Sequence, residues 1–64
     1  MLFATMSRSV AVIIPCLNES IPIAGVVREV LAQGVDRVIV VDNGSTDDTA
    51  QQAAAAGATV VSEP

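Results

Sequence analysis

The sequence predicts an α/β fold in which a parallel sheet is built through β-α-β-α-β connections. Of the 64 residues, 52% are hydrophobic, and most of these are valine, isoleucine and alanine, with Phe3 as the single aromatic residue. Short runs rich in β-branched residues alternate with segments of helical spacing, and turn-forming residues separate the two. Parallel strands that are covered by helices have this composition.

The first strand is expected at residues 10–14, a short run of mostly β-branched residues. Pro15 follows, and it marks the end of the strand because proline cannot donate a hydrogen bond to a β-ladder. Residues 1–9 show no usable period, so they are expected to be a leader of uncertain order. Residues 10–64 are then one partial domain.

An amphipathic helix is expected next, because apolar residues recur from Ile23 to Leu31 at spacings of three and four. Ser20 is a suitable N-terminal cap, Pro22 is tolerated in the first turn, and Gly34 is expected to end the helix.

The second half of the chain repeats this order. Residues 37–41 are expected to form a buried strand that ends at the turn-forming sequence Asp-Asn-Gly-Ser of residues 42–45. Ser45 and Asp48 have the spacing of a capping box, which would place Asp47 and Asp48 in the first turn of a second helix.

The second helix is expected to end at Gly57 and to turn the small side chains of Ala50, Ala53 and Ala54 toward the sheet. A third strand at residues 59–61 completes the pattern. Right-handed crossovers would put both helices on one face of the sheet. The bare face predicts either self-association or contact with a missing remainder of the domain.

Charge and cysteine content limit the classes of function. Three basic and seven acidic residues give a net charge of −4, which argues against nucleic-acid binding because there is no basic face for phosphates. Cys16 has no partner for a disulfide, so it is expected to be a free thiol in a reducing compartment, and we expect a cytoplasmic protein. The sequence shows no targeting or transmembrane segment.

Two polar turns are expected at the carboxyl ends of the first two strands, where open α/β sheets bind ligands. The first turn has no glycine, which weakens a dinucleotide or P-loop interpretation. Glu19 could accept hydrogen bonds from ribose hydroxyls, and Asp42 could accept one from a base or a ribose. The pattern indicates recognition of a nucleoside.

Each of these residues also has a simpler structural interpretation. Glu19 could be an exposed acid at a helix start, and Asp42 could be an ordinary turn residue. Residues 45–48 are explained by helix capping alone. Cys16 is interpreted as part of a pocket wall, because the chain has no histidine that could activate it as a nucleophile.

Two segments resemble the first two motifs of family-2 glycosyltransferases. They are Val-Ile-Ile-Pro-Cys-Leu-Asn-Glu at residues 12–19 and Val-Ile-Val-Val-Asp-Asn-Gly-Ser-Thr-Asp at residues 38–47. The segment Ala-Gly-Ala-Thr-Val-Val at residues 56–61 is similar to dolichol-phosphate mannosyltransferase-like enzymes and glucosyl-3-phosphoglycerate synthases. The resemblance covers nearly everything from Val10 onward.

The resemblance implies the N-terminal, nucleotide-binding portion of a GT-A fold, which is Rossmann-like. It implies that Glu19 meets the ribose and that Asp42 and Asn43 meet the base. The residues implied to bind the nucleotide sugar are Pro15, Cys16, Leu17, Asn18, Glu19, Asp42 and Asn43.

The same resemblance implies a full-length parent that uses a UDP or GDP sugar together with a divalent cation, Mg²⁺ or Mn²⁺. The cation's ligands and the catalytic residues are expected outside this chain, so the chain alone is expected to be inactive. Two alternatives stay open: a Rossmann-type dinucleotide-binding module and a non-catalytic α/β module that self-associates.

Overall fold

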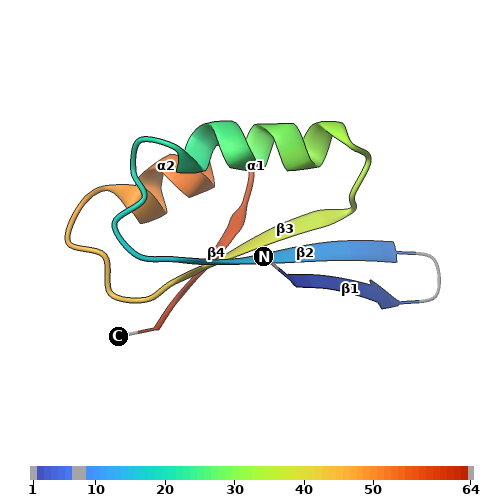
Figure 1. The fold of residues 1–64 in the computed structure, drawn as a ribbon, viewed down its shortest axis with the longest axis horizontal. Helices are drawn as coiled ribbons and strands as arrows, with labels where there is room; N and C mark the ends of the chain where they lie inside the picture. Colours follow the sequence, from blue (N-terminus) through green and yellow to red (C-terminus); the bar gives the residue numbers. More distant parts are fainter. Residues whose placement is uncertain (1, 7–8, 64) are drawn as a thin grey trace.

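The computed structural model describes residues 2–6 and 9–63 and shows a sheet covered by two helices (Figure 1). Residues 1, 7, 8 and 64, which include part of the predicted leader, lie outside that description. The elements follow in the order β1 (Leu2–Met6), β2 (Ser9–Cys16), α1 (Ile23–Ala32), β3 (Arg37–Asp42), α2 (Thr49–Ala55) and β4 (Thr59–Ser62).

The four strands form one sheet in the order β1-β2-β3-β4. Strands β2, β3 and β4 are parallel, which confirms the predicted β-α-β-α-β pattern. In the register of β2 and β3, Cys16 lies opposite Asp42. The loops that follow these two strands therefore leave the sheet side by side.

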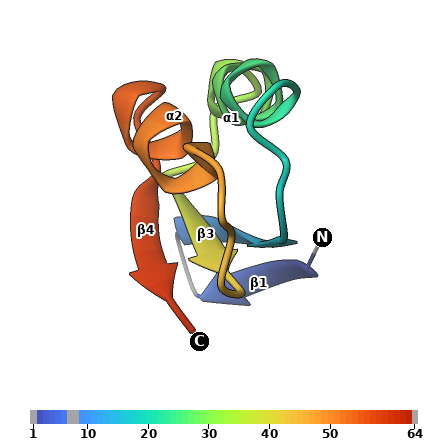
Figure 2. The same cartoon turned by 90° about the vertical axis from the view of Figure 1, so that its left-hand side faces the viewer.

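Both helices cover the same face of the sheet, as predicted (Figures 1 and 2). Alternate strand residues point toward the helices and are buried together with the inward side chains of α1 and α2. This core consists of Val12, Ile14, Cys16, Ile23, Val27, Val30, Val38, Val40 and Ala53. A single apolar layer thus packs against β2 and β3 and fixes the positions of their C-terminal ends.

The first strand of the structure was not expected. Residues 2–6 pair with β2 in antiparallel fashion, from Leu2 opposite Ile13 to Met6 opposite Ser9. Strand β2 also continues through Pro15 to Cys16, beyond the predicted end. Pro15 is accommodated because, among the described residues, the pairing with β1 ends at Ile13, so one side of β2 has no strand partner at Pro15, where proline is tolerated.

Both predicted N-terminal caps were wrong. Helix α1 has Pro22 at its N-cap position, and no side chain caps it, so Ser20 does not act as predicted. Helix α2 begins at Thr49, with no acidic residue in its first turn. Ser45 does not cap α2; instead, the Asp47 carboxylate accepts a hydrogen bond from the Thr49 amide at 3.0 Å.

The predicted inward stripe of α2 was only partly right. Ala53 is buried and Ala50 is half-buried, but Ala54 is exposed, and the other fully buried residue of the helix is Thr49. The C-terminal ends of both helices agree with the prediction. Gly34 and Gly57 adopt positive φ angles of 87° and 110°, which glycine reaches without steric cost.

None of the helices in the described part of the chain has the length and apolar character needed to cross a membrane.

Candidate functional site

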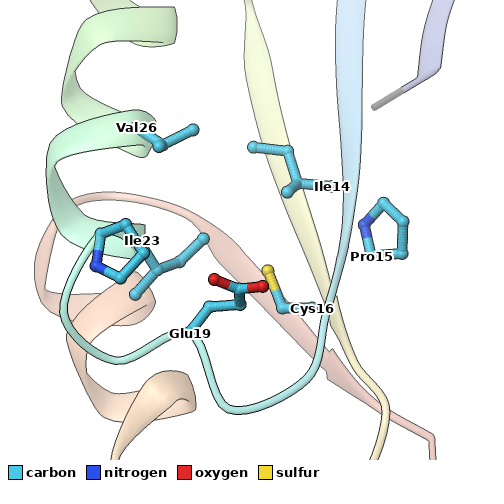
Figure 3. Close-up of a pocket in the computed structure, with 7 residues that line it drawn as sticks. Ile14, Pro15, Cys16, Glu19, Ile23 and Val26 are labelled. Atoms are coloured by element: carbon cyan, nitrogen blue, oxygen red, sulfur yellow. The ribbon is translucent and has the colours of Figure 1, made fainter.

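A pocket of about 170 Å³ opens between the end of β2 and the start of α1 (Figure 3). It is lined by Ile14, Pro15, Cys16, Glu19, Pro22, Ile23 and Val26. Glu19 is the only charged residue of this lining, and Figure 3 shows its carboxylate directed into the space between strand and helix, beside Cys16. The pocket therefore presents one anionic acceptor within apolar walls.

Cys16 lies near both acidic groups of the site, Glu19 and Asp42. Burial raises the pKa of its thiol, and the negative charges of Glu19 and Asp42 raise it further. A thiol with a raised pKa stays protonated at neutral pH and is a poor nucleophile. The structure thus supports the interpretation of Cys16 as a pocket wall.

Asp42 ends β3 with only 7% of its surface exposed. Its Oδ1 accepts hydrogen bonds from the Ser45 amide at 3.1 Å and from the Ser45 hydroxyl. Gly44, with a φ of 84°, allows the chain to turn back so that Ser45 reaches the carboxylate. Asp42 is therefore a turn residue as well as a candidate ligand, and its orientation is set by Ser45.

The turn that follows β2 and the turn that follows β3 are joined directly to each other. The amide of Asn43 donates to the carbonyl of Cys16 at 2.9 Å, and the amide of Asn18 donates to the Ser45 hydroxyl oxygen at 2.9 Å. The side-chain carbonyl of Asn18 in turn accepts from the Thr46 amide at 2.9 Å. Asn18 has a φ of 52°, a left-handed conformation that asparagine tolerates better than most residues.

A second set of bonds joins the turns nearer to the helices. The hydroxyl oxygen of Thr49 accepts the Glu19 amide at 2.9 Å, and the hydroxyl donates to Asp47. The Ser20 amide also donates to Asp47, at 3.4 Å. The turn after β2 is consequently attached to the turn after β3 through three consecutive amides, those of residues 18, 19 and 20.

The seven predicted nucleotide-binding residues occupy different positions around this site. Pro15, Cys16 and Glu19 line the pocket, while Asp42 lies beside Cys16 across the strand pair. The other three are less directly placed. Asn18 and Asn43 are exposed and take part in the bonds between the turns, and Leu17 is 55% exposed and does not line the pocket.

One wall of the pocket is not among the residues predicted from the sequence to bind the ligand. Ile23 and Val26 belong to the apolar stripe from which α1 is predicted. Both residues also line the pocket, where they face the last residues of β2 (Figure 3). The spacing of the stripe contained the signal, but it could not show which of its members lie at the end of the sheet.

The arrangement favours an uncharged, hydrogen-bonding ligand. Two carboxylates offer acceptors to hydroxyl or N–H donors, and the apolar walls suit a ring face. The described residues contain no cluster of three or more histidine, cysteine or acidic side chains that could hold a metal ion. They therefore do not make a complete metal site.

Comparison with known proteins identifies the family of this chain. A family model described as "Glycosyl transferase family 2" matches residues 11–64. Glucosyl-3-phosphoglycerate synthase of Mycolicibacterium smegmatis is 47% identical over 62 residues, which cover 92% of this chain and 20% of that protein. An uncharacterized glycosyltransferase of Mycobacterium bovis is 50% identical over 56 residues, covering 88% of this chain and 25% of that protein.

Solved structures show the same fold. The crystal structure of glucosyl-3-phosphoglycerate synthase from Mycobacterium tuberculosis in complex with Mg²⁺ and UDP matches with a TM-score of 0.75 and 45% identity, over 81% of this chain and 20% of that one. A crystal structure of that enzyme with Mn²⁺, UDP-glucose and glycerol 3-phosphate also gives a TM-score of 0.75. The predicted GT-A type of fold is thereby confirmed.

The chain spans about one fifth of the length of these synthases. Within that span the family model matches all but the first ten residues. The family predicted from the two sequence motifs is therefore confirmed, and the chain belongs to glycosyl transferase family 2.

Proposed function

We propose that this chain supplies the nucleoside-binding turns of a glycosyltransferase that uses a nucleotide-diphosphate sugar, with a UDP sugar as the favoured donor. The observation that carries the proposal is the attachment of the two turns to each other, which brings both Glu19 and Asp42 near Cys16. Related enzymes that share this fold have been solved with UDP and with UDP-glucose.

In this proposal Glu19 accepts hydrogen bonds from ribose hydroxyls within the pocket, and Asp42 accepts one from an N–H of the base. The base would bind beside Asn43, and residues 15–18 would border the nucleoside. Oδ1 of Asp42 is engaged by Ser45, and within the described residues no hydrogen bond reaches Oδ2. We therefore assign the base contact to Oδ2.

Diphosphate and metal binding are proposed for the parent enzyme and not for these residues. Related structures hold Mg²⁺ or Mn²⁺ together with UDP. The carboxylates described here form no group that could hold such an ion, so its ligands are expected elsewhere in the parent. We expect this chain to bind the nucleoside part of UDP without transferring a sugar. A cytoplasmic location remains a prediction, based on the single unpaired cysteine.

Titration of the chain with UDP, GDP and NAD, in which binding is measured by calorimetry or by amide NMR shifts, tests the proposal. We expect UDP to bind and NAD not to bind. The reverse result would support the dinucleotide-binding alternative and reject the transferase interpretation.

The Asp42→Asn variant sharpens this test. The amide oxygen can still accept from Ser45, but its NH₂ group replaces the acceptor that would face the base. Loss of a hydrogen bond to a charged group costs about 1.5–3 kcal/mol, so UDP affinity should fall roughly 10- to 100-fold. Asp48→Asn is the matched control, because Asp48 is exposed and, within the described residues, bonds only to the side chain of Gln52 and, through its carbonyl, to the Gln52 amide.

A further inference from the structure

Thr49 is a polar residue with 0% of its surface exposed, although it begins a helix at the surface of the sheet. Its hydroxyl oxygen accepts from the Glu19 amide at 2.9 Å, and its hydroxyl donates to Asp47. Valine has nearly the same shape and would fill the same space without a buried polar group. The hydroxyl therefore serves a hydrogen bond across the two turns and not the filling of the core.

The backbone of Glu19 is held on both sides. Its N–H is bound by Thr49, and its carbonyl accepts the amide of Ile23, the first residue of α1, at 3.0 Å. With both groups engaged, the direction of the Cα–Cβ bond of Glu19 is set. No hydrogen bond to the Glu19 carboxylate occurs within the described residues, so the held backbone is what sets the point from which this side chain enters the pocket (Figure 3).

We propose that Thr49 is a positioning residue, whose hydroxyl holds the Glu19 carboxylate in the orientation that meets the ribose of the bound nucleotide. This inference rests on the proposed function for its ligand, but the contact itself can be measured without one. Thr49 does not line the pocket and is not expected to touch the nucleotide.

Two substitutions at position 49 separate the hydroxyl from the side-chain shape. In Thr49→Val the Glu19 amide loses its acceptor, so its hydrogen exchange should quicken roughly tenfold or more and UDP should bind roughly tenfold more weakly. Thr49→Ser keeps the hydroxyl and should restore both properties. Thr46→Val is the matched control and should change neither property, because the one hydrogen bond of the exposed Thr46 hydroxyl to the described residues is a long one, at 3.4 Å to Asn18.

A double-mutant cycle tests whether Thr49 acts through Glu19. If it does, Thr49→Val should cost little further UDP affinity in a Glu19→Gln background, because the carboxylate that it orients is already gone. A purely structural role of Thr49 would instead lower affinity by the same factor in both backgrounds, and that result would overturn the inference.

The remaining outcomes are also decisive. A Glu19 amide that exchanges freely in the unmodified chain overturns the inference, even if the valine variant fails to fold. UDP binding that is unchanged in a folded Thr49→Val variant overturns it while leaving the proposed function intact. If the unmodified chain binds no UDP, the proposed function fails, and the role of Thr49 in nucleotide binding fails with it. Hydrogen exchange of the Glu19 amide in Thr49→Val then still shows whether the Thr49 hydroxyl holds the Glu19 backbone.

Discussion

At the residue scale, the site uses the same side-chain chemistry twice. Ser45 accepts the Asn18 amide and donates to Asp42, and Thr49 accepts the Glu19 amide and donates to Asp47. Each hydroxyl is thus held between a carboxylate and a backbone N–H of the other turn. A carboxylate polarises the hydroxyl that donates to it, which strengthens the bond that this hydroxyl accepts.

Asp47 should give the fold a measurable sensitivity to acid. The side-chain hydrogen bond from Thr49 is the main cause that holds the pKa of Asp47 below its ordinary value of 3.8, and amide hydrogen bonds from Thr49 and Ser20 add to it. A lowered folded-state pKa contributes stability that is complete above the ordinary pKa and is lost as the pH falls through the lowered one.

Urea unfolding between about pH 5 and about pH 2 measures this contribution. Asp47→Asn should unfold more easily than the unmodified chain at pH 5 and lose less stability on acidification, because the charged acceptor is absent. Asp48→Asn serves as control. An unchanged acid dependence in Asp47→Asn would show that another carboxylate is responsible.

At the element scale, the ends of the helices are set by glycine and by tertiary contacts more than by local caps. Both helices lack a side-chain cap at the residue before their first turn. Their C-terminal ends, in contrast, are closed by glycines with positive φ. The free energy of unfolding should therefore fall when alanine replaces a glycine with a positive φ, and it should rise when alanine replaces a glycine inside a helix.

Gly57 and Gly25 provide that comparison. At Gly57 the φ angle is 110°, and an added Cβ would lie 3.1 Å from Cδ1 of Leu31, so Gly57→Ala should lower the free energy of unfolding by about 1–3 kcal/mol. Gly25 lies inside α1 with no atom within 4 Å of an added Cβ. Gly25→Ala should raise the free energy of unfolding by about 0.5–1 kcal/mol. Urea unfolding of both variants checks the pair, and a gain in stability for Gly57→Ala would contradict the assignment of its backbone strain.

At the scale of the whole molecule, the sheet has one covered and one uncovered face. Ile39 and Val41 of β3 alternate with the buried residues of that strand, and Val61 of β4 lies in register with Val41. Val61 is 42% exposed. An apolar sheet face of this kind favours association, because burying it removes hydrocarbon surface from water.

Sedimentation velocity across a range of concentrations should therefore show self-association of this chain. Val61→Lys places a charge on the uncovered face and should shift the distribution toward monomer. Gln51→Lys adds the same charge at an exposed position of α2 and should leave the association unchanged. A monomer at all concentrations in the unmodified chain would contradict the prediction.

The sequence by itself determined the α/β class, the three parallel strands, the C-terminal ends of both helices and the family. These follow from local patterns: β-branched runs for strands, three- and four-residue spacing for helices, glycine where φ must be positive, and two motifs of ordered residues. It also predicted Glu19 and Asp42 as the acidic residues of the site, because each lies at or soon after the end of a buried strand.

Only the tertiary structure decided how the turns are joined and where the helices begin. Ser20, Ser45 and Asp48 have local capping chemistry, yet the Ser20 amide bonds to Asp47 and the Ser45 hydroxyl accepts the Asn18 amide, each across more than 20 residues, which local spacing does not encode. Strand β1 escaped prediction because its pairing is supplied by β2 and not by its own pattern. The same long-range contacts gave Thr49 its role: a threonine at a helix start looks ordinary until the fold brings the Glu19 amide within 2.9 Å of its hydroxyl.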